Sequence, residues 1–395
     1  MSEPTSSLHA VAPPAAPKVY HPSAASAPAA RLGWPADEAL ADQRRFLTQV
    51  WLRAWAEHLP RAGRWAGPLR ILTAQNGAGE VSAVLPLASL RLLPGVSLPA
   101  LAGPRQPFRG IPVNREGLAG SIEQLAEQIL ADRRLPALRL SSVLGQDAAV
   151  DTLVSYLRLR GWMVHERFLY LTLATPLPQS MAALYEQLGK RSEKRKRERE
   201  SRLKREGGYQ IRVYTGLDGA QARKVVAELA DIERRSWLLK QDGDTQFQTE
   251  EGRAFWQTIL SHPTDGRAWR VFILTFKDQP AAYDVCVDAG RTRYVLCGHY
   301  DDAYKPLSLG TTIDLEVFRD AIDNKLACLD FGHGDSGYKQ RTLGALPAGT
   351  LRDVVVASPT AKGRAFFAAS TAWTLADEWR RAREAMTARK AESTA

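Results

Sequence analysis

The residues best suited to chemistry gather between Gly298 and Arg341. His299 follows a predicted strand and precedes a polar loop, so its imidazole is a candidate general base; a structural hydrogen bond fits the same position. A predicted helix begins beside Ser308-Leu309-Gly310-Thr311-Thr312. The first N–H groups of a helix have no intrahelical partners and its dipole favours negative charge, which suits a pyrophosphate. A hydroxyl residue at this place can also be a simple helix cap.

Other catalytic classes leave no pattern in the sequence. Cys286, Cys297 and Cys328 have no metal-binding spacing and lie on predicted strands with apolar neighbours, so we expect them to pack rather than react. No paired histidine and carboxylate spacing occurs, and we predict no metal. The sequence also lacks a P-loop, a dinucleotide fingerprint and a Gly-x-Ser-x-Gly elbow.

The segment 190–206 has an unusual composition, with ten Lys or Arg and four Glu. Glu193 with Arg197, Glu198 with Arg202, and Glu200 with Lys204 are spaced as i,i+4 ion pairs on a helix. One interpretation is a solvated helix. The other is an anion-binding face for phosphates, an anionic membrane surface or nucleic acid. Because the segment has no apolar stripe, contact with a membrane would be electrostatic.

Helices and strands alternate in the half of the chain that precedes this segment. Hydrophobic periodicity predicts the elements, and Asn76-Gly77 predicts a hairpin turn. The expected helices are 40–58, 121–130 and 148–160, and the expected strands are 69–74, 80–87, 137–140 and 168–173. A short helix is expected from Ser180.

The second half repeats this content, so a duplicated fold is one interpretation. The expected helices are 217–239, 311–325 and a tail at 361–391, and the expected strands are 209–214, 270–276, 281–288, 292–298 and 326–331. Such alternation predicts an α/β or α+β fold.

Composition sets the broad class. The chain has 395 residues, a net charge of +10 and 45% hydrophobic residues, which excludes a mainly disordered or fibrous protein. Residues 1–30 are rich in Ala, Pro and Ser and have no basic or apolar signal region, so we expect a disordered tail. The three cysteines indicate a reducing compartment. We therefore expect a cytoplasmic protein, peripheral to the inner face of the cytoplasmic membrane if it meets lipid.

Two segments carry a family resemblance. Tyr300–Gly310, followed by an amphipathic helix, and Leu329–Arg341, which reads Asp-Phe-Gly-His-Gly-Asp-Ser-Gly-Tyr-Lys-Gln-Arg after Leu329, resemble motifs of the CelD-like/FemAB-like branch of the GNAT acyl-CoA N-acyltransferases. The basic run, Glu233–Trp237 and Val84–Leu87 are similar to further features of that group. The resemblance covers roughly residues 35 to 345 and is more specific in the C-terminal half.

The resemblance implies tandem GNAT-like lobes, each a mixed sheet flanked by helices. The implied parts are a tail (1–30), an N-terminal lobe (31–178), a basic helical connector (179–207), a C-terminal acyltransferase lobe (208–356) and a helical tail (357–395). Acyl-CoA would be the cosubstrate, with its pantetheine near Val295–Gly298 and its pyrophosphate at the Leu309–Thr312 amides. The implied donor-binding residues are Cys297, Gly298, Ser308, Leu309, Gly310, Thr311 and Thr312.

The resemblance also implies roles around the thioester. His299 is the candidate base, Asp335 could orient a cationic acceptor, and Tyr338 could protonate the leaving thiolate. The implied acceptor-binding residues are Glu233, Trp237, Tyr300, Asp330, His333, Lys339 and Arg341. The sequence departs from the family pattern at Leu309, where Pro is frequent, and at His333 and Ser336-Gly337, which bear on acceptor specificity.

The resulting hypothesis is direct transfer of an acyl group from acyl-CoA to an amine of a cell-envelope precursor. An amino sugar is one acceptor, and a sphingoid long-chain base is another, which would make this a bacterial ceramide synthase. One alternative is a FemAB-like transferase that takes an aminoacyl group from tRNA. Another is a nucleic-acid-binding protein built round 190–206, although that segment has no interleaved aromatic residues and matches no recognition motif.

Overall fold

The computed structural model describes most of the chain. The described residues are 18–20, 48–58, 65–93, 96–103, 107–189, 191–237, 239, 245–262, 268–334 and 337–394. The tail expected at 1–30 therefore lies outside the described residues, except for the short strand Lys18–Tyr20.

Twelve strands form one mixed sheet, in the order β1-β2-β3-β4-β5-β12-β6-β11-β10-β9-β8-β7. Their bounds are β1 Lys18–Tyr20, β2 Trp65–Gln75, β3 Val81–Leu93, β4 Val96–Leu101, β5 Ala137–Leu144, β6 Met163–Pro176, β7 Tyr209–Tyr214, β8 Trp269–Phe276, β9 Gln279–Ala289, β10 Thr292–Tyr300, β11 Cys328–His333 and β12 Leu346–Ala357. The expected mixed sheet flanked by helices is confirmed.

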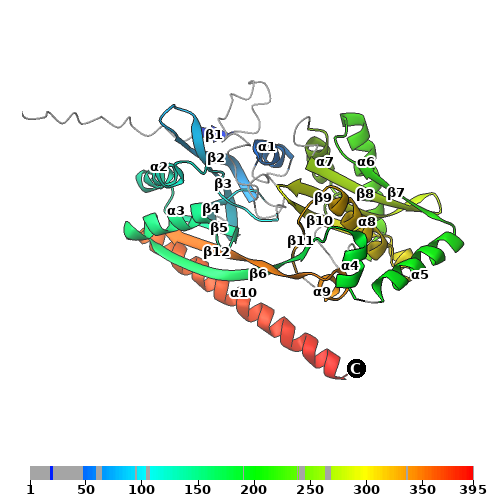
Figure 1. Cartoon of the computed structure of the whole chain (residues 1–395). Coiled ribbons are helices and arrows are strands. Elements are labelled where there is room, and N and C mark those ends of the chain that lie inside the picture. The colour runs from blue at the N-terminus through cyan, green and yellow to red at the C-terminus, as the bar shows by residue number, and fades with distance from the viewer. Residues whose placement is uncertain are drawn as a thin grey trace, which may run out of the picture.

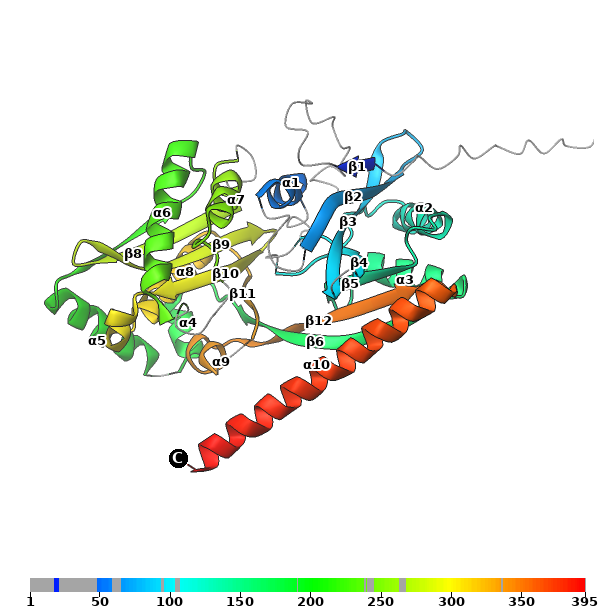
Figure 2. The same ribbon diagram turned by 180° about the vertical axis from the view of Figure 1, so that it is seen from behind.

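Helices cover the sheet in groups (Figures 1 and 2). Their bounds are α1 Gln49–His58, α2 Leu118–Ala131, α3 Ala148–Leu159, α4 Met181–Gln187, α5 Ser192–Arg205, α6 Gly219–Arg235, α7 Glu250–Leu260, α8 Leu309–Asp323, α9 Tyr338–Leu343 and α10 Ala361–Thr394, with a 3-10 helix η5 at Asp302–Leu307. Apolar residues of α2 and α3 share one core with β2, β3, β5 and β12. Those of α8 form a second core with β8, β9 and β11, and those of α1, α6 and α7 form a third.

The last strand of each half lies beside strands of the other half. β6 follows α3 in the chain, yet it pairs with β11 through Cys328–Asp330. β12 ends the second half, yet it pairs with both β5 and β6. Beneath these strands the helix α10 runs along the sheet and then leaves it (Figure 2). The two halves are therefore joined by exchanged strands within one continuous sheet.

A β-α-β unit occurs twice. In the first unit β4 and β5 are parallel neighbours that pair only at Ala100–Arg139, with α2 between them in sequence. In the second, β10 and β11 are parallel neighbours with α8 between them. In the first unit, the segment around Arg109 lies between β4 and β5, because Arg109 bridges to Val143 and its N–H donates to the Ser142 carbonyl. In the second unit, no such segment lies between β10 and β11 among the described residues, and their pairing ends at Tyr294–Asp330.

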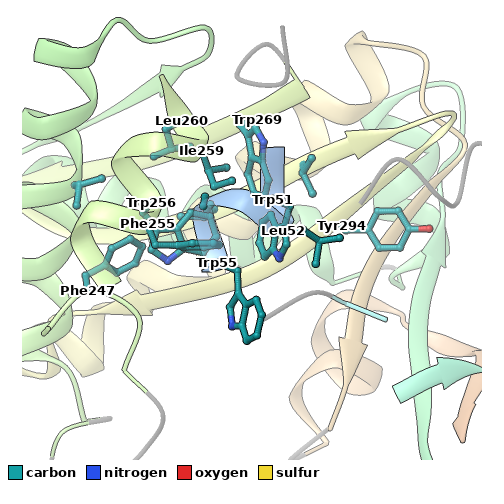
Figure 3. Close-up of a cluster of buried hydrophobic side chains, with 14 of the residues drawn as sticks. Trp51, Leu52, Trp55, Phe247, Phe255, Trp256, Ile259, Leu260, Trp269 and Tyr294 are labelled. Atoms are coloured by element: carbon teal, nitrogen blue, oxygen red, sulfur yellow. The ribbon is translucent and has the colours of Figure 1, made fainter. Parts of the chain in front are cut away.

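Aromatic side chains join α1 to the C-terminal half (Figure 3). The Trp51 ring stacks on Trp269 with centroids 5.5 Å apart, and it meets Phe255 edge-on at 5.0 Å. Trp256 contacts both tryptophans edge-on. Trp51 is 2% exposed, so this contact is a dry core rather than a loose interface.

Most expected elements are confirmed, with shifted ends. The Asn76-Gly77 hairpin joins β2 and β3, and the basic run forms α5. Of its expected ion pairs only Glu193–Arg197 forms. The expected Glu198–Arg202 and Glu200–Lys204 pairs are wrong, because these acids contact Lys194 and Lys196 one turn earlier and Arg202 contacts Glu206.

Candidate functional site

β10 and β11 separate part-way along their length. Their parallel register runs from Thr292–Cys328 to Tyr294–Asp330 and then ends, although both strands continue. On its other side β10 has a register shift between Val295 and Cys297 in its pairing with β9. The backbone beyond this irregularity faces an opening, and Gly298 is exposed in the middle of the sheet. We call the opening between the two strands the splay.

The helix α8 begins at one end of the splay. Ser308, the residue before it, has left-handed backbone angles (φ 54°, ψ 46°) and makes no side-chain cap hydrogen bond. Intrahelical bonding begins where the Thr312 N–H donates to the Ser308 carbonyl at 3.2 Å. Gly310 packs against the Tyr300 ring, since a Cβ there would lie 3.2 Å from Tyr300 Cδ1. The expected residues Ser308–Thr312 thus form the start of a helix beside the end of β10.

Tyr338 and α8 form a polar cluster on one face of the sheet. The Tyr338 hydroxyl donates to Asp314 Oδ2 at 2.5 Å and lies 2.9 Å from Thr311 Oγ1. Burial, together with the Asp314 charge, raises the pKa of Tyr338 far above its usual value, so the phenol keeps its proton. Burial also raises the pKa of Asp314 to about 6. Sequence reasoning found Tyr338 and Thr311 but missed Asp314.

Asp284 of β9 lies beneath Gly298. A Cβ on Gly298 would lie only 1.7 Å from Asp284 Oδ1, so the missing side chain makes room for this carboxylate. Asp284 is 4% exposed and its Oδ2 has no partner among the described residues. Burial, followed by the nearby Asp314 charge, raises its pKa well above the usual range. The sequence signal was an acid at a core position of the predicted strand 281–288.

His299 lies on the opposite face. Its ring meets Tyr283 edge-on at 5.7 Å and Trp237 at 6.2 Å. Burial lowers the pKa of His299 below its usual value, although the Glu233 charge opposes this, so the imidazole is neutral at neutral pH. Trp237 is 38% exposed, which leaves an apolar surface beside the imidazole.

Glu233 is fully buried and holds a loop. Its carboxylate accepts hydrogen bonds from the N–H groups of Gln246 and Phe247 at 2.8 and 2.9 Å and from Gln248 Nε2 at 3.1 Å. Both oxygens are therefore engaged within the protein. The structure places Glu233 near His299 but turned towards residues 246–248.

The end of β11 contains the other expected residues. Tyr170 of β6 stacks on His333 with ring centroids 4.5 Å apart. Lys339 Nζ donates to the carbonyls of Phe331 and His333 at 2.7 and 3.0 Å, so it ties α9 to this strand end. Asp330 Oδ1 accepts the Gly332 N–H at 2.6 Å in a local turn.

Arg341 is the remaining expected residue near this turn among the described ones. Arg341 lies over Gly337, where a Cβ would be 2.8 Å from the guanidinium. Asp335, the expected acceptor-orienting residue, lies outside the described residues.

No group of three or more His, Cys, Asp or Glu side chains in the described ranges could hold a metal ion. No helix in the same ranges is long and apolar enough to cross a membrane.

A family model for the acetyltransferase (GNAT) domain matches residues 190–340, from the basic run to α9. These residues are therefore similar to the GNAT domain. The matched range contains the splay, the start of α8 and the Tyr338 cluster. No curated protein matches the chain.

Solved structures extend the likeness to the remaining strands. FemX matches with 13% identity and a TM-score of 0.54, over 80% of this chain and 96% of the other. The C-terminal domain of a putative lysylphosphatidylglycerol synthetase from Agrobacterium fabrum matches with 12% identity, a TM-score of 0.47, and 84% and 96% coverage. A tandem GNAT protein from the clavulanic acid biosynthesis pathway matches with 13% identity, a TM-score of 0.43, and 79% and 88% coverage. The likeness to FemX shows a shared fold across both halves of the chain.

Proposed function

We propose that this protein is an acyl-CoA-dependent N-acyltransferase that transfers an acyl group directly to an amine. The observation that carries the proposal is the splay, which exposes the β10 backbone at Gly298 between a neutral imidazole on one face and a protonated phenol on the other. A thioester lying in the splay would meet a base and an acid from opposite sides.

The reaction needs one bond formed and one broken. The amine nitrogen attacks the thioester carbonyl, the N–C bond forms and the C–S bond breaks. His299 accepts the proton that the amine loses, and the Tyr338 O–H turns from Asp314 Oδ2 to the sulfur and donates a hydrogen bond to the leaving thiolate. Before the thiolate forms, Asp314 and Thr311 hold that hydroxyl in place. The free N–H groups at the start of α8 would bind the donor's pyrophosphate.

The proposed acceptor is an amine of a cell-envelope precursor. Trp237 is 38% exposed and its ring touches that of His299, so the acceptor side of the splay has apolar surface. That surface supports a long-chain base over an amino sugar. The exposed cations of α5 support peripheral contact with an anionic membrane surface on the cytoplasmic side.

Thermal unfolding with matched concentrations of acetyl-CoA, a long-chain acyl-CoA and free CoA tests the donor. A ligand at about 100 times its dissociation constant adds roughly 2.7 kcal/mol of stability. We expect the unfolding midpoint to rise with all three, and most with the long-chain donor. No rise with any of them, in a folded sample, would contradict the proposal.

An aminoacyl-tRNA donor is the second candidate. It is favoured by Arg191, Arg195 and Arg199, which lie at successive i,i+4 positions on one side of α5 and make no ion pair within the described residues. The test is transfer with charged tRNA as the donor. Activity that ribonuclease abolishes would support it, and activity with acyl-CoA alone would exclude it.

A further inference from the structure

A polar cavity of about 320 Å³ lies between α5, β7 and α8. Its charged lining comprises Lys196, Arg199, Glu200, Lys204, Glu316 and Arg319. Both acids are already neutralised, since Lys196 Nζ lies 3.1 Å from Glu200 and Arg319 Nη1 lies 2.6 Å from Glu316. The cavity therefore has two cations in excess, Arg199 and Lys204.

Arg199 is a partly buried cation whose neighbouring acid, Glu200, is paired with Lys196. Its guanidinium makes no hydrogen bond or ion pair with any described residue, and its surroundings include the phenols of Tyr185 and Tyr338. Burial lowers the pKa of Arg199, because the guanidinium has lost hydrating water and the protein does not fully replace it. A bound anion would supply the missing partner.

The charge and the geometry favour a phosphoryl group. A phosphate monoester carries about −1.5 to −2 charges at neutral pH, which balances the two uncompensated cations. The guanidinium fork binds two phosphate oxygens at once. Tyr209 and Thr312 also line the cavity, and the Thr312 hydroxyl donates to the Ser308 carbonyl at 3.2 Å.

α8 lies between this cavity and the Tyr338 cluster, and Arg199 lies near the Tyr338 phenol as well as in the cavity lining. Thr312, Leu315, Glu316 and Arg319 line the cavity, whereas the neighbouring Thr311 and Asp314 bond to Tyr338. The cavity therefore adjoins the splay through one shared helix and uses different side chains.

We propose that this cavity binds a phosphoryl group, with the Arg199 guanidinium as its principal ligand and Lys204 as the second cation. The group belongs either to the acyl donor or to a separate phosphate ester. The site goes beyond the proposed transfer reaction, because its occupation requires no acyl chemistry.

Titration of the full-length protein with inorganic phosphate, at ionic strength held constant with chloride, tests the site. We expect saturable binding by isothermal titration calorimetry. Arg199→Gln should weaken it at least about tenfold, since it removes a charge-assisted hydrogen-bonding pair. Arg199→Lys keeps the charge and loses the fork, so it should weaken binding less.

Arg205→Gln is the matched control. Arg205 also lies on α5, is exposed and does not line the cavity, and this variant loses the same charge. It should leave phosphate affinity within about twofold of the parent protein. Equal weakening by both variants, or no saturable binding by the parent protein, would overturn the proposal.

Repeating the titration with saturating CoA distinguishes the two sources. If CoA displaces phosphate, and Arg199→Gln also weakens CoA binding, the phosphoryl group belongs to the donor. If phosphate binds equally with and without CoA, it belongs to a separate ester. Because phosphate affinity is read without a transfer assay, a failure here is distinguishable from a failure of the proposed function.

Discussion

The side chains of His299 and Tyr338, on the two faces of the splay, have pKa values shifted in opposite directions. His299 is held neutral by burial, whereas Tyr338 is held protonated by burial and by the Asp314 charge. Pairs of groups whose environments drive their pKa values in opposite senses are typical of acid–base sites. The splay places such a pair around one exposed glycine backbone.

The pH profile should reveal His299. A base must be unprotonated, and burial lowers its pKa below 6.5, so kcat/KM should fall with acid at a midpoint below 6.5. His299→Gln should lose this acidic limb and lower kcat/KM by about 10²–10⁴-fold. His165→Gln, a change at a remote histidine of β6, should keep the limb. A limb that persists in His299→Gln would show that another group is the base.

Tyr338→Phe should lower kcat by about 10²-fold or more while the protein stays folded, because only the hydroxyl is lost. Tyr156→Phe is the matched control. Its hydroxyl also donates to a carboxylate at 2.5 Å, that of Glu127, but it lies on α3 far from the splay. The measurement is the steady-state kcat of both variants. Equal kcat values would show that the Tyr338 hydroxyl takes no part in the reaction.

Asp314 should make stability depend on pH. Its pKa is about 6 in the folded chain against 3.8 for the ordinary group. Between these values the folded state binds more protons than the unfolded state, so the free energy of unfolding falls as the pH rises through this window. The loss from this group amounts to up to roughly 3 kcal/mol. Asp314→Asn should flatten that slope in denaturant titrations, and an unchanged slope would contradict the assignment.

Position within the motifs predicted His299 and Tyr338 but did not predict the carboxylates of Asp284 and Asp314. Asp314 lies on the amphipathic helix, where an acid is ordinarily solvated, and helical periodicity does not reveal its hydrogen bond to Tyr338 of α9. Glu233 shows the opposite outcome. Its sequence position matched a family feature, yet its two oxygens are bound by the 246–248 loop.

At the scale of elements, β9 and β10 are fitted to each other at one point. Asp284 of β9 pairs with Gly298 of β10, directly after the register shift in β10. β10 is thus unpaired beside β11 at Gly298, and on its β9 side the missing Cβ leaves room for the Asp284 carboxylate.

Gly298→Ala should destabilise the protein by about 1–3 kcal/mol, because its Cβ would overlap Asp284 Oδ1. In an Asp284→Ala background the same change should cost markedly less, since the obstructing oxygen is absent. Chemical denaturation of the four proteins in this cycle measures the coupling. Additive effects would mean that the two residues do not meet.

Periodicity was sufficient for the elements that form the splay. The expected strand 292–298 and the expected helix at 311–325 correspond to β10 and α8 with ends shifted by two residues. β12 was not predicted, because its first half is largely exposed and contains Pro347 and Gly349. α7 was also missed, although its sequence has helix signals: a Thr249 cap, two acids in the first turn and buried apolar residues at helical spacing.

At the scale of the whole molecule, the aromatic contact between α1 and α7 fixes one half of the chain against the other (Figure 3). The described residues on both sides are almost fully buried. The geometry of the splay's acceptor face, which adjoins this core, therefore depends on residues far away in the sequence.

Trp51→Ala should lower the free energy of unfolding by about 3–5 kcal/mol, as removal of a large buried ring leaves a cavity among three aromatic neighbours. Trp379→Ala on α10, where the side chain is 67% exposed, should change stability by no more than about 0.5 kcal/mol. Equal effects in denaturant titrations would show that the contact is not a core.

The exchanged strands have a consequence during synthesis on the ribosome. β5 is complete at Leu144, but its partner β12 is made only when residues 346–357 have been translated. At about 5–20 residues per second, the nascent chain therefore waits on the order of ten seconds or more with β5 unpaired on that side. During that interval the exposed strand edge is a site for chaperone binding or for pairing with another nascent chain.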